Sequence, residues 1–267
     1  MPIALKAFLR ELLPVAAQVP VKYWYNWARG SLEPEMSLLK YLIAKDDRVV
    51  DVGGNRGIYA YHCWKLGGIV EVFEPNPVCV RVLEAWAHGR HRVTLHAVGL
   101  SNQTGATNLH IPMDEAGIEH DASASIEHHA FSHARDQLIS LRTLDSYGFN
   151  DARFIKIDVE GHEFSVIEGA AETLSRLRPA LLVEIEQRHC VRPIDEVFAK
   201  VLSHNYRGFF LDNGTLRPLD SFDLERDQAG ANFGRVDTRY INNFLFLHDA
   251  RCAGGEYRVL LERFGYK

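Results

Sequence analysis

The sequence has little of what marks a disulfide-rich, membrane-spanning or nucleic-acid-binding protein. It contains 4 cysteines in 267 residues, scattered without paired spacing, so it predicts neither a disulfide framework nor a zinc site. The formal net charge is −5 at pH 7, and no cluster of lysine or arginine suggests a nucleic-acid partner. Sparse, unpaired cysteines are typical of a reducing compartment, so we expect a cytoplasmic protein.

Long apolar runs are also missing. The most apolar stretch, residues 3–21, is interrupted by Lys6, Arg10, Glu11, Pro14 and Pro20. These interruptions argue against a transmembrane segment. We expect an amphipathic helix in an N-terminal extension over residues 1–34, broken at the prolines and packed on the main domain. A position over the substrate or on a membrane surface is the alternative.

The rest of the chain alternates short apolar strands with helical stretches, which predicts an α/β fold with a mostly parallel sheet and helices on both faces. We expect one domain over residues 35–250, followed by a C-terminal tail over 251–267. Strands are predicted at 48–52, 69–73, 92–98, 154–158, 180–186, 207–211 and 240–247. Helices are predicted at 35–45, 58–66, 77–87, 162–177 and 194–204.

The segment Asp51-Val-Gly-Gly-Asn-Arg-Gly-Ile-Tyr59 follows the first predicted strand, and Glu74 ends the second. Strand, glycine-rich turn, helix, strand and acid in this order are typical of a site that holds an adenine nucleoside by its ribose. Glycine at 53 and 54 would let the backbone approach the ligand, because a side chain there would fill the space.

The spacing argues against a dinucleotide. In the pattern G-x-G-x-x-G, Gly54 and Gly57 supply the last two glycines, but the first falls on Val52. The turn instead opens with Asp51, whose negative charge suits a positively charged ligand better than two phosphates. A nucleoside that carries a sulfonium fits this description, and a nicotinamide dehydrogenase does not.

Six motifs, in order, resemble the FkbM family of methyltransferases. They are Asp51-Val-Gly-Gly-Asn-Arg-Gly, Phe73-Glu-Pro-Asn-Pro, Leu95-His-Ala-Val-Gly-Leu-Ser, Thr143-Leu-Asp, Phe154-Ile-Lys-Ile-Asp-Val-Glu-Gly-His-Glu and Asn242-Asn-Phe-Leu-Phe. The resemblance covers about residues 35–248. It implies a seven-stranded Rossmann-like fold, S-adenosylmethionine as methyl donor, and O-methylation of a hydroxyl on a sugar or a polyketide. Gly54 stands where the family commonly has alanine, which should only loosen the turn.

The predicted cofactor site gathers residues from several motifs. Val98 ends the third strand beside the expected adenine, and Ser123 with Ser125 is expected to line the pocket from the loop that follows. The predicted cofactor-binding residues are Asp51, Gly53, Gly54, Asn55, Gly57, Tyr59, Glu74, Pro75, Asn76, Val98, Ser123 and Asp158.

Asp158 and His162 are the predicted catalytic residues. Asp158 ends the fourth strand, next to the first strand at the switch point of the sheet, where ligands of such folds bind. His162 follows the turn at Gly161, and an imidazole is a natural base for an acceptor hydroxyl, with Asp158 orienting it or binding the acceptor. A purely structural role for His162 at the start of a helix is the alternative.

Three further matters stay open in the sequence. A required metal is not predicted, although Asp158, Glu184 and His162 could bind a divalent cation. The polar segment 113–135, including Ile118 to His129, is the expected acceptor-recognition loop. Besides a sugar O-methyltransferase, the sequence allows an N-methyltransferase, a methyltransferase of other small molecules, or a non-catalytic nucleoside-binding protein.

Overall fold

The computed structural model describes residues 13–114, 119, 123–127, 133–233, 235 and 238–266. The strands are β1 (Arg48–Val52), β2 (Ile69–Phe73), β3 (Val93–His96), β4 (Gly99–Leu100), β5 (Gly105–Pro112), β6 (Ala134–Arg142), β7 (Ala152–Ile157), β8 (Ala180–Glu184), β9 (Tyr206–Asp212), β10 (Thr215–Pro218) and β11 (Asn243–His248). The main helices are α2 (Val15–Ala28), α3 (Leu39–Leu42), α4 (Ile58–Lys65), α5 (Pro77–Ala87), α6 (Glu163–Glu168), α7 (Ala171–Leu177), α8 (Ile194–Leu202), α9 (Leu224–Asp227), α10 (Asp249–Ala253) and α11 (Arg258–Arg263).

The main sheet confirms the α/β prediction and carries one strand more than expected. Its order is β10-β9-β11-β8-β7-β1-β2-β3, with β1, β2, β3, β7 and β8 parallel and β11 antiparallel to its neighbours. The seven predicted strands are all present. The eighth, β10, pairs with β9 as a short antiparallel hairpin strand that ends at Pro218.

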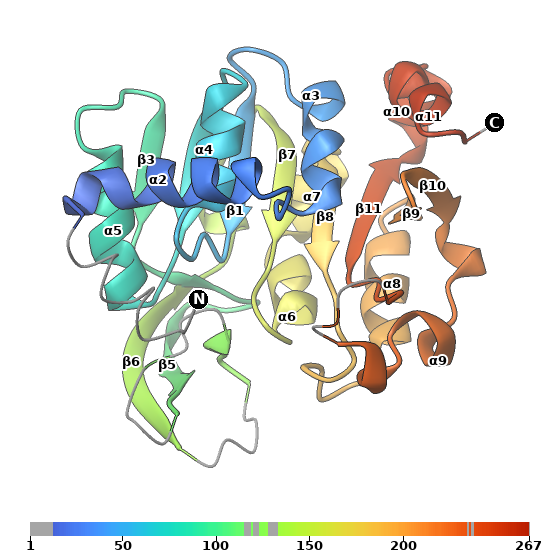
Figure 1. Ribbon diagram of the computed structural model, residues 1–267. Coiled ribbons are helices and arrows are strands. Elements are labelled where there is room, and N and C mark those ends of the chain that lie inside the picture. The colour runs from blue at the N-terminus through green and yellow to red at the C-terminus, as the bar shows by residue number, and fades with distance from the viewer. Residues whose placement is uncertain are drawn as a thin grey trace.

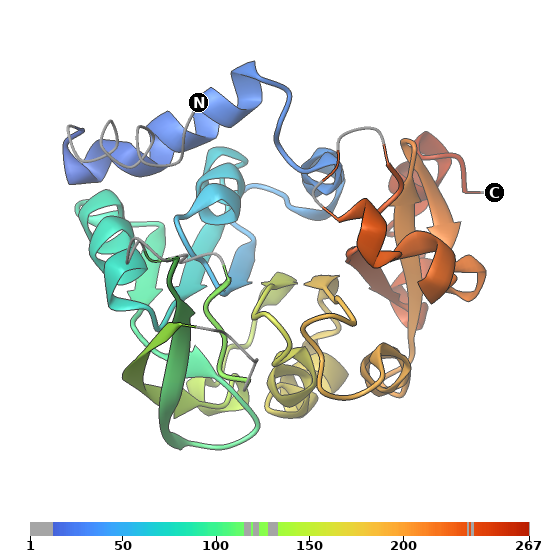
Figure 2. The same ribbon diagram turned by 60° about the horizontal axis from the view of Figure 1, so that its bottom comes forward.

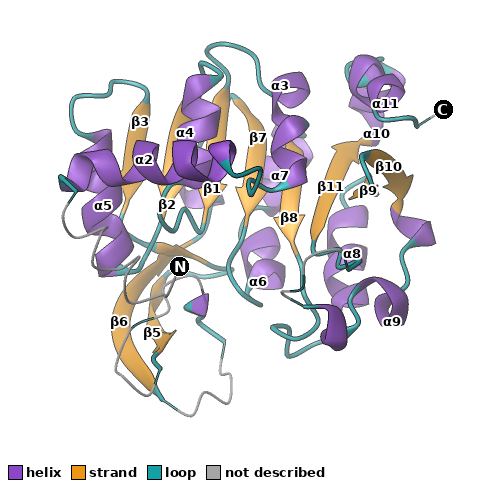
Figure 3. Cartoon of the chain, viewed as in Figure 1, coloured by secondary structure: helices purple, strands orange, loops and turns teal. Residues whose placement is uncertain are grey.

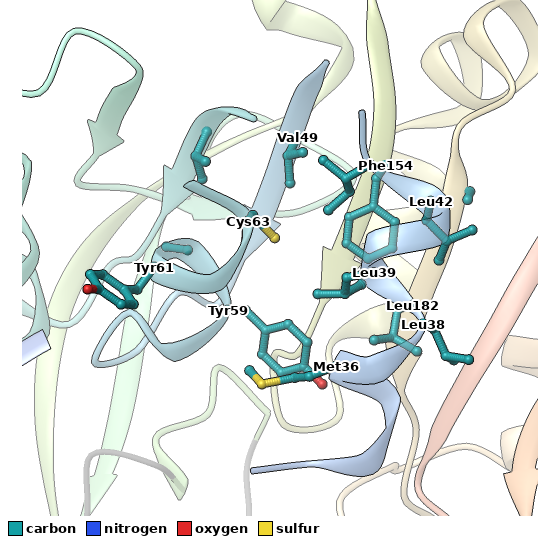
Figure 4. Close-up of a cluster of buried hydrophobic side chains, with 14 of the residues drawn as sticks. Met36, Leu38, Leu39, Leu42, Val49, Tyr59, Tyr61, Cys63, Phe154 and Leu182 are labelled. Atoms are coloured by element: carbon teal, nitrogen blue, oxygen red, sulfur yellow. The ribbon is translucent and has the colours of Figure 1, made fainter. Parts of the chain in front are cut away.

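The central strands are buried on both faces, and their side chains alternate between two cores. In β1, Val49 faces a core with η1 (Pro34–Ser37), α3, α4, α5 and α11, whereas Val50 faces a core with α6, α7 and α8. Figure 3 shows the helices around the sheet, and Figure 4 shows part of the first core, which includes Met36, Leu39 and Tyr59.

The described part of the N-terminal extension contains one long helix, which Pro20 does not break, whereas residues 1–12 of the predicted extension lie outside the described residues. Helix α2 begins after Pro14, runs through Pro20, and lies across α4 and α5 (Figure 1). Val19 and Tyr23 flank Pro20 and are buried against the domain, which holds the helix on both sides of the proline. Among the described residues, no helix has the length and apolar composition needed to cross a bilayer.

The last part of the chain is packed, not a loose tail. Helices α10 and α11 follow β11 directly, and Tyr257 and Leu260 are buried in the first core. The Phe264 carbonyl accepts a hydrogen bond from the Leu216 amide of β10, at 2.9 Å. This segment therefore completes the domain.

A second sheet lies between β3 and β7 in the chain and has the order β4-β6-β5. The β5–β6 hairpin projects beyond the edge where β1, β2 and β7 end (Figure 1, Figure 2). Its apolar side packs with Ala124 and Ile126. Of the expected acceptor loop, residues 115–118, 120–122 and 128–132 lie outside the described residues.

Candidate cofactor and acceptor site

The turn after β1 is shaped by contacts within the protein. Gly53 has φ +78°, and a Cβ atom there would lie 1.7 Å from the carbonyl oxygen of Asp158, at the end of the neighbouring strand. A Cβ on Gly54 would lie 2.3 Å from Cγ1 of Val72. Contacts within the protein therefore account for glycine at both positions, and room for a ligand is not the main reason. An alanine at position 54 would collide with Val72 and would also change the turn. Gly57, at φ +75°, starts α4 in the left-handed conformation.

Glu74 is fixed at the end of β2. Its Oε2 accepts a hydrogen bond from the Asn55 amide at 2.6 Å, and its Oε1 accepts one from the Asn76 amide at 2.7 Å. The carboxylate lines a cavity of about 60 Å³, which we call the Glu74 cavity. Each oxygen has a second lone pair, so the carboxylate can still accept from hydroxyl groups of a ligand. Asn76 itself caps α5 by accepting from the Val78 amide, and it does not line this cavity.

The Glu74 cavity has an apolar part of its wall, as an aromatic base requires. This part includes the predicted Pro75 and Val98, together with residues from the second sheet and from the connection between β5 and β6. Its lining residues are Val52, Gly53, Asn55, Phe73, Glu74, Pro75, Val98, Gly99, Leu100, Leu109, Ala124, Ile126, Asp158, Val159 and Glu160.

Ser123 and Ser125 lie differently from the prediction. Ser123 is exposed and does not line the cavity, whereas its neighbours Ala124 and Ile126 do. Ser125 is buried, and its hydroxyl donates to the Glu160 carbonyl at 2.6 Å. It therefore ties this loop to the segment after β7, and the apolar side chains beside it form the wall.

A second cavity, of about 270 Å³, meets the first at the β1 turn, and we call it the Lys156 cavity. Both cavities share Gly53, Asn55, Asp158 and Glu160. The second is lined by Lys22, Glu33, Asp51, Gly53, Gly54, Asn55, Arg56, Ile58, Tyr59, Lys156, Asp158, Glu160 and Glu184. Five carboxylates and three cations make it a polar, acid-rich space.

Lys156 holds the carboxylates of this cavity together. It projects from β7 and is 1% exposed. Its Nζ lies 3.8 Å from Oδ2 of Asp158 and 3.9 Å from Oε2 of Glu184, and it donates to the Asn243 side-chain oxygen at 3.2 Å. Although burial opposes the charge, the surrounding carboxylates raise the pKa of Lys156, so it is a permanent ammonium.

Asp51 lines this cavity, and one of its carboxylate oxygens, Oδ2, is buried without a hydrogen-bond donor among the described residues. Burial, with the nearby charge of Asp158, raises the Asp51 pKa to about 7, although Lys156 acts in the opposite direction. A buried, half-satisfied carboxylate of this kind is costly until a donor arrives.

Glu184 is the last residue of β8 and Glu186 follows the strand, and the pKa values of the two carboxylates are shifted in opposite directions. Burial and the charge of Asp158 raise the Glu184 pKa well above its usual value, whereas Asn242 donates to its Oε1 at 2.7 Å. Burial acts the same way on Glu186, but hydrogen bonds from Arg188 and Tyr240 outweigh it and lower the Glu186 pKa to about 2. Glu184 therefore faces the cavity as the more basic carboxylate, and Glu186 is a structural anion.

His162 lies at the start of α6, away from both cavity linings. Its Nδ1 is 2.6 Å from Oε1 of Glu127, and its Nε2 is 2.9 Å from Oγ of Ser101. The imidazole is buried with both nitrogens engaged. In this arrangement it joins the loop that carries Ala124 and Ile126 to the main domain, and its predicted role as a base stays a prediction.

The three residues of the alternative metal site do not all lie close together. Asp158 and Glu184 both approach Lys156, whereas His162 binds Ser101 and Glu127. Within the described ranges, no three histidine, cysteine, aspartate or glutamate side chains form a group that could hold a metal ion.

Several site residues were missed from the sequence. Lys156 sits in an apolar strand, where a lysine is unusual, and that was the available signal. Glu33 reaches the site from before η1, where its carboxylate accepts from the hydroxyl of the predicted Tyr59 and from Asn243. No local pattern reveals such a contact.

The sequence is similar to those of known proteins. The family described as "Methyltransferase FkbM domain" matches residues 51–207. A curated relative, the hexuronic acid methyltransferase AglP of Haloferax volcanii, is 27% identical over 163 residues, which are 60% of this chain and 65% of the relative. That alignment spans less than two thirds of the relative's length.

Two solved structures are similar in outline. The methyltransferase FkbM from Methylobacillus flagellatus KT is 17% identical, with a TM-score of 0.49, over 90% of this chain and 57% of that chain. A putative methyltransferase from Streptococcus mutans in complex with SAH is 10% identical, with a TM-score of 0.45, over 81% of this chain and 98% of that chain. The family match alone covers more than half of the sequence and includes Asp51, Glu74 and Asp158. The protein therefore belongs to the FkbM methyltransferase domain family.

Proposed function

We propose that this protein transfers a methyl group from S-adenosylmethionine to a hydroxyl of a sugar, a glycan or another polyhydroxylated metabolite. The observation that carries the proposal is the joining of two unlike cavities at one glycine turn. The Glu74 cavity offers an apolar wall and a fixed carboxylate, and the Lys156 cavity offers carboxylates in excess of cations. A ligand with a nucleoside at one end and positive charge at the other complements both.

The two cavities contain residues that would bind each part of S-adenosylmethionine. Glu74 would accept from the ribose hydroxyls, and Val98, Pro75 and Ile126 would pack against the adenine. The unused Oδ2 of Asp51 would accept from the ammonium of the methionyl part, which removes the cost of leaving that oxygen buried without a partner. S-adenosylmethionine, when bound, supplies an electrophilic methyl group.

The acceptor hydroxyl must lose its proton as the methyl group is transferred to its oxygen. Two carboxylates of the Lys156 cavity would be available to accept or orient that proton. Asp158 and Glu184 line the same cavity and flank Lys156 at nearly equal distances. Burial and the charge of Asp158 raise the pKa of Glu184, and Asn242 fixes one of its oxygens, which suits it to accept a proton. We assign proton removal to Glu184 and acceptor positioning to Asp158. Lys156 keeps both carboxylates in the cavity.

The acceptor class rests on the relative that is named a hexuronic acid methyltransferase. Acidic sugars would find cations in the cavity lining at Lys22 and Arg56, and their hydroxyls would find carboxylate acceptors. The proposal therefore names acidic sugars as the first acceptors to test, with neutral sugars next.

The test is methyl transfer from labelled S-adenosylmethionine to a panel of glucuronate-containing, neutral and amino-sugar oligosaccharides, read by mass spectrometry. We expect a mass gain of one methyl group on a hydroxyl-bearing sugar, lost in Glu184→Gln and Asp158→Asn and kept in Asp220→Asn, which changes an exposed acid. Methylation only at nitrogen would contradict the O-methyltransferase proposal. Donor binding without transfer to any panel member would contradict the acceptor class.

A further inference from the structure

Helix α2 carries an exposed aromatic surface that the proposed reaction does not use. Val21 is 43% exposed, Trp24 44%, Tyr25 43% and Trp27 60%. The buried side of the same helix is supplied by Val19 and Tyr23, so these four side chains are not needed to attach it to the domain. Figure 2 shows α2 as an outer layer of the molecule.

Two cationic side chains lie over exposed aromatic rings of α2. The Lys65 ammonium lies 3.9 Å from the centre of the Trp24 ring, and the Arg29 guanidinium lies 5.5 Å from the centre of the Tyr25 ring. No acidic residue occurs between Glu11 and Glu33, although the whole chain has a net charge of −5. The α2 surface, which we define as Val21, Trp24, Tyr25 and Trp27 with Arg29 and Lys65, is therefore aromatic and positive on an acidic protein.

We infer that the α2 surface docks on an anionic lipid membrane. Tryptophan and tyrosine are the side chains that favour the boundary between lipid tails and headgroups, because one part of each is apolar and the other is polar. Lysine and arginine beside them attract anionic headgroups, and a helix with both features lies in the plane of the interface. Lys65 and Arg29, which contact the Trp24 and Tyr25 rings, would then lie beside the lipid headgroups.

The charge pattern favours this occupant over a second copy of the chain. In a two-fold dimer the same surface meets itself, so Arg29 and Lys65 would face their own counterparts. Like charges brought together in this way oppose association. A bilayer that contains acidic lipids instead presents the opposite charge over the whole surface.

The test is sedimentation of the full-length protein with vesicles of phosphatidylcholine mixed with phosphatidylglycerol, and with vesicles of phosphatidylcholine alone. No methyl donor or acceptor is present, so a negative result leaves the proposed function untouched. We expect binding to the mixed vesicles that weakens as salt is raised, with a blue shift of tryptophan fluorescence. Trp24→Ala with Trp27→Ala should weaken it at least about tenfold, and Lys65→Gln with Arg29→Gln should weaken it and reduce its salt dependence.

Matched controls separate this surface from general effects. Leu138→Ala truncates an apolar side chain that is 69% exposed on β6, and Arg217→Gln removes an exposed cation on β10. Both should bind vesicles as the unchanged protein does. Circular dichroism and donor binding should confirm that the double variants are folded. Failure of the unchanged protein to bind mixed vesicles, or equal binding by the tryptophan variant and Leu138→Ala, would overturn the inference. Sedimentation equilibrium that shows a dimer broken by the tryptophan variant would assign the surface to self-association instead.

Discussion

A Cβ atom on Gly53 would lie 1.7 Å from the carbonyl oxygen of Asp158, so the ends of β1 and β7 meet with no room for a side chain. This contact places the glycine turn, which borders both cavities, against the residue assigned to acceptor positioning. The close approach of the two strand ends is therefore part of the site as well as of the fold.

Gly53→Ala should unfold or strongly destabilise the protein. The new methyl group would meet backbone that cannot move without distorting β7, and the residue would also keep a φ of +78°. We expect a loss of more than about 3 kcal/mol in the free energy of unfolding, measured by urea titration. Gly89→Ala is the control, because Gly89 has φ +74° but open space around its Cβ position. It should cost only about 1 kcal/mol. Equal losses in the two variants would contradict the steric account.

Asp51→Asn should make the ligand-free protein more stable above pH 7. The folded pKa of Asp51 is about 7 against an ordinary value of 3.8, so the folded state holds a proton that the unfolded state releases. Stability therefore falls as pH rises from about 4 to 7, and the cost is fully present above pH 7. Removing the charge should recover about 2–4 kcal/mol at pH 8 and little at pH 4.

Glu35 and Glu163 titrate in the same range, since burial raises the pKa of each to about 7. The measurement is accordingly the difference between Asp51→Asn and the unchanged protein in urea unfolding at a series of pH values. Asp220→Asn, at an exposed position, should give no such difference. A variant that is less stable than the unchanged protein at pH 8 would show that Asp51 has a donor in the free protein.

Lys156→Met should be among the most damaging changes in the site. It leaves the carboxylates of Asp158 and Glu184 in one cavity without the buried cation that both approach. We expect a loss of about 3–5 kcal/mol in unfolding free energy. Adding Glu184→Gln to Lys156→Met should restore part of it, because one uncompensated charge is then removed.

Lys200→Met is the matched control for this lysine. Lys200 forms a 3.1 Å ion pair with Glu168, but its side chain is 28% exposed, so its loss should cost less than about 1 kcal/mol. Double-mutant cycles by chemical denaturation give the coupling directly. If Glu184→Gln gives no recovery in the Lys156→Met background, Lys156 does not hold that carboxylate.

His162→Gln distinguishes the predicted base from a positioning residue. The imidazole joins Glu127 to Ser101, and Ala124 and Ile126 of the same loop line the Glu74 cavity. For a positioning residue we expect a loss of about 1–3 kcal/mol in stability and weaker donor binding, with an unchanged pH–rate profile. A fall in kcat of about 100-fold or more at unchanged stability and donor affinity would assign the base to His162.

The strand-end residues were predictable from the sequence for a simple physical reason. Asp51 lies near the end of β1, Glu74 follows β2 and Asp158 follows β7, and the carboxyl ends of parallel strands share one edge of the sheet. The pattern of apolar strands therefore predicted that these three acids lie near one another without tertiary information. The short strand β10 was missed because its four residues, ending in proline, carry no clear alternation.

Residues placed by irregular backbone were less predictable. In the segment 123–127, Ala124 and Ile126 line the cavity where serines were expected, since no strand or helix period fixes which side chains face inward. The helix that begins after His162 turns that imidazole toward Ser101, a direction that the motif does not encode. Asn243 accepts a hydrogen bond from Lys156, which lies 87 positions away in the sequence, and no local pattern reveals such a contact.

Calorimetric titration of the cofactor-stripped protein with S-adenosylmethionine, and separately with NAD, tests the central claim most directly. We predict binding of S-adenosylmethionine at about micromolar Kd and no binding of NAD, with the former weakened at least tenfold, about 1.4 kcal/mol, in Asp51→Ala and in Glu74→Ala. Asp220→Ala should bind as the unchanged protein does. A folded protein that does not bind S-adenosylmethionine, or that binds it equally well without Asp51 and Glu74, would contradict the account.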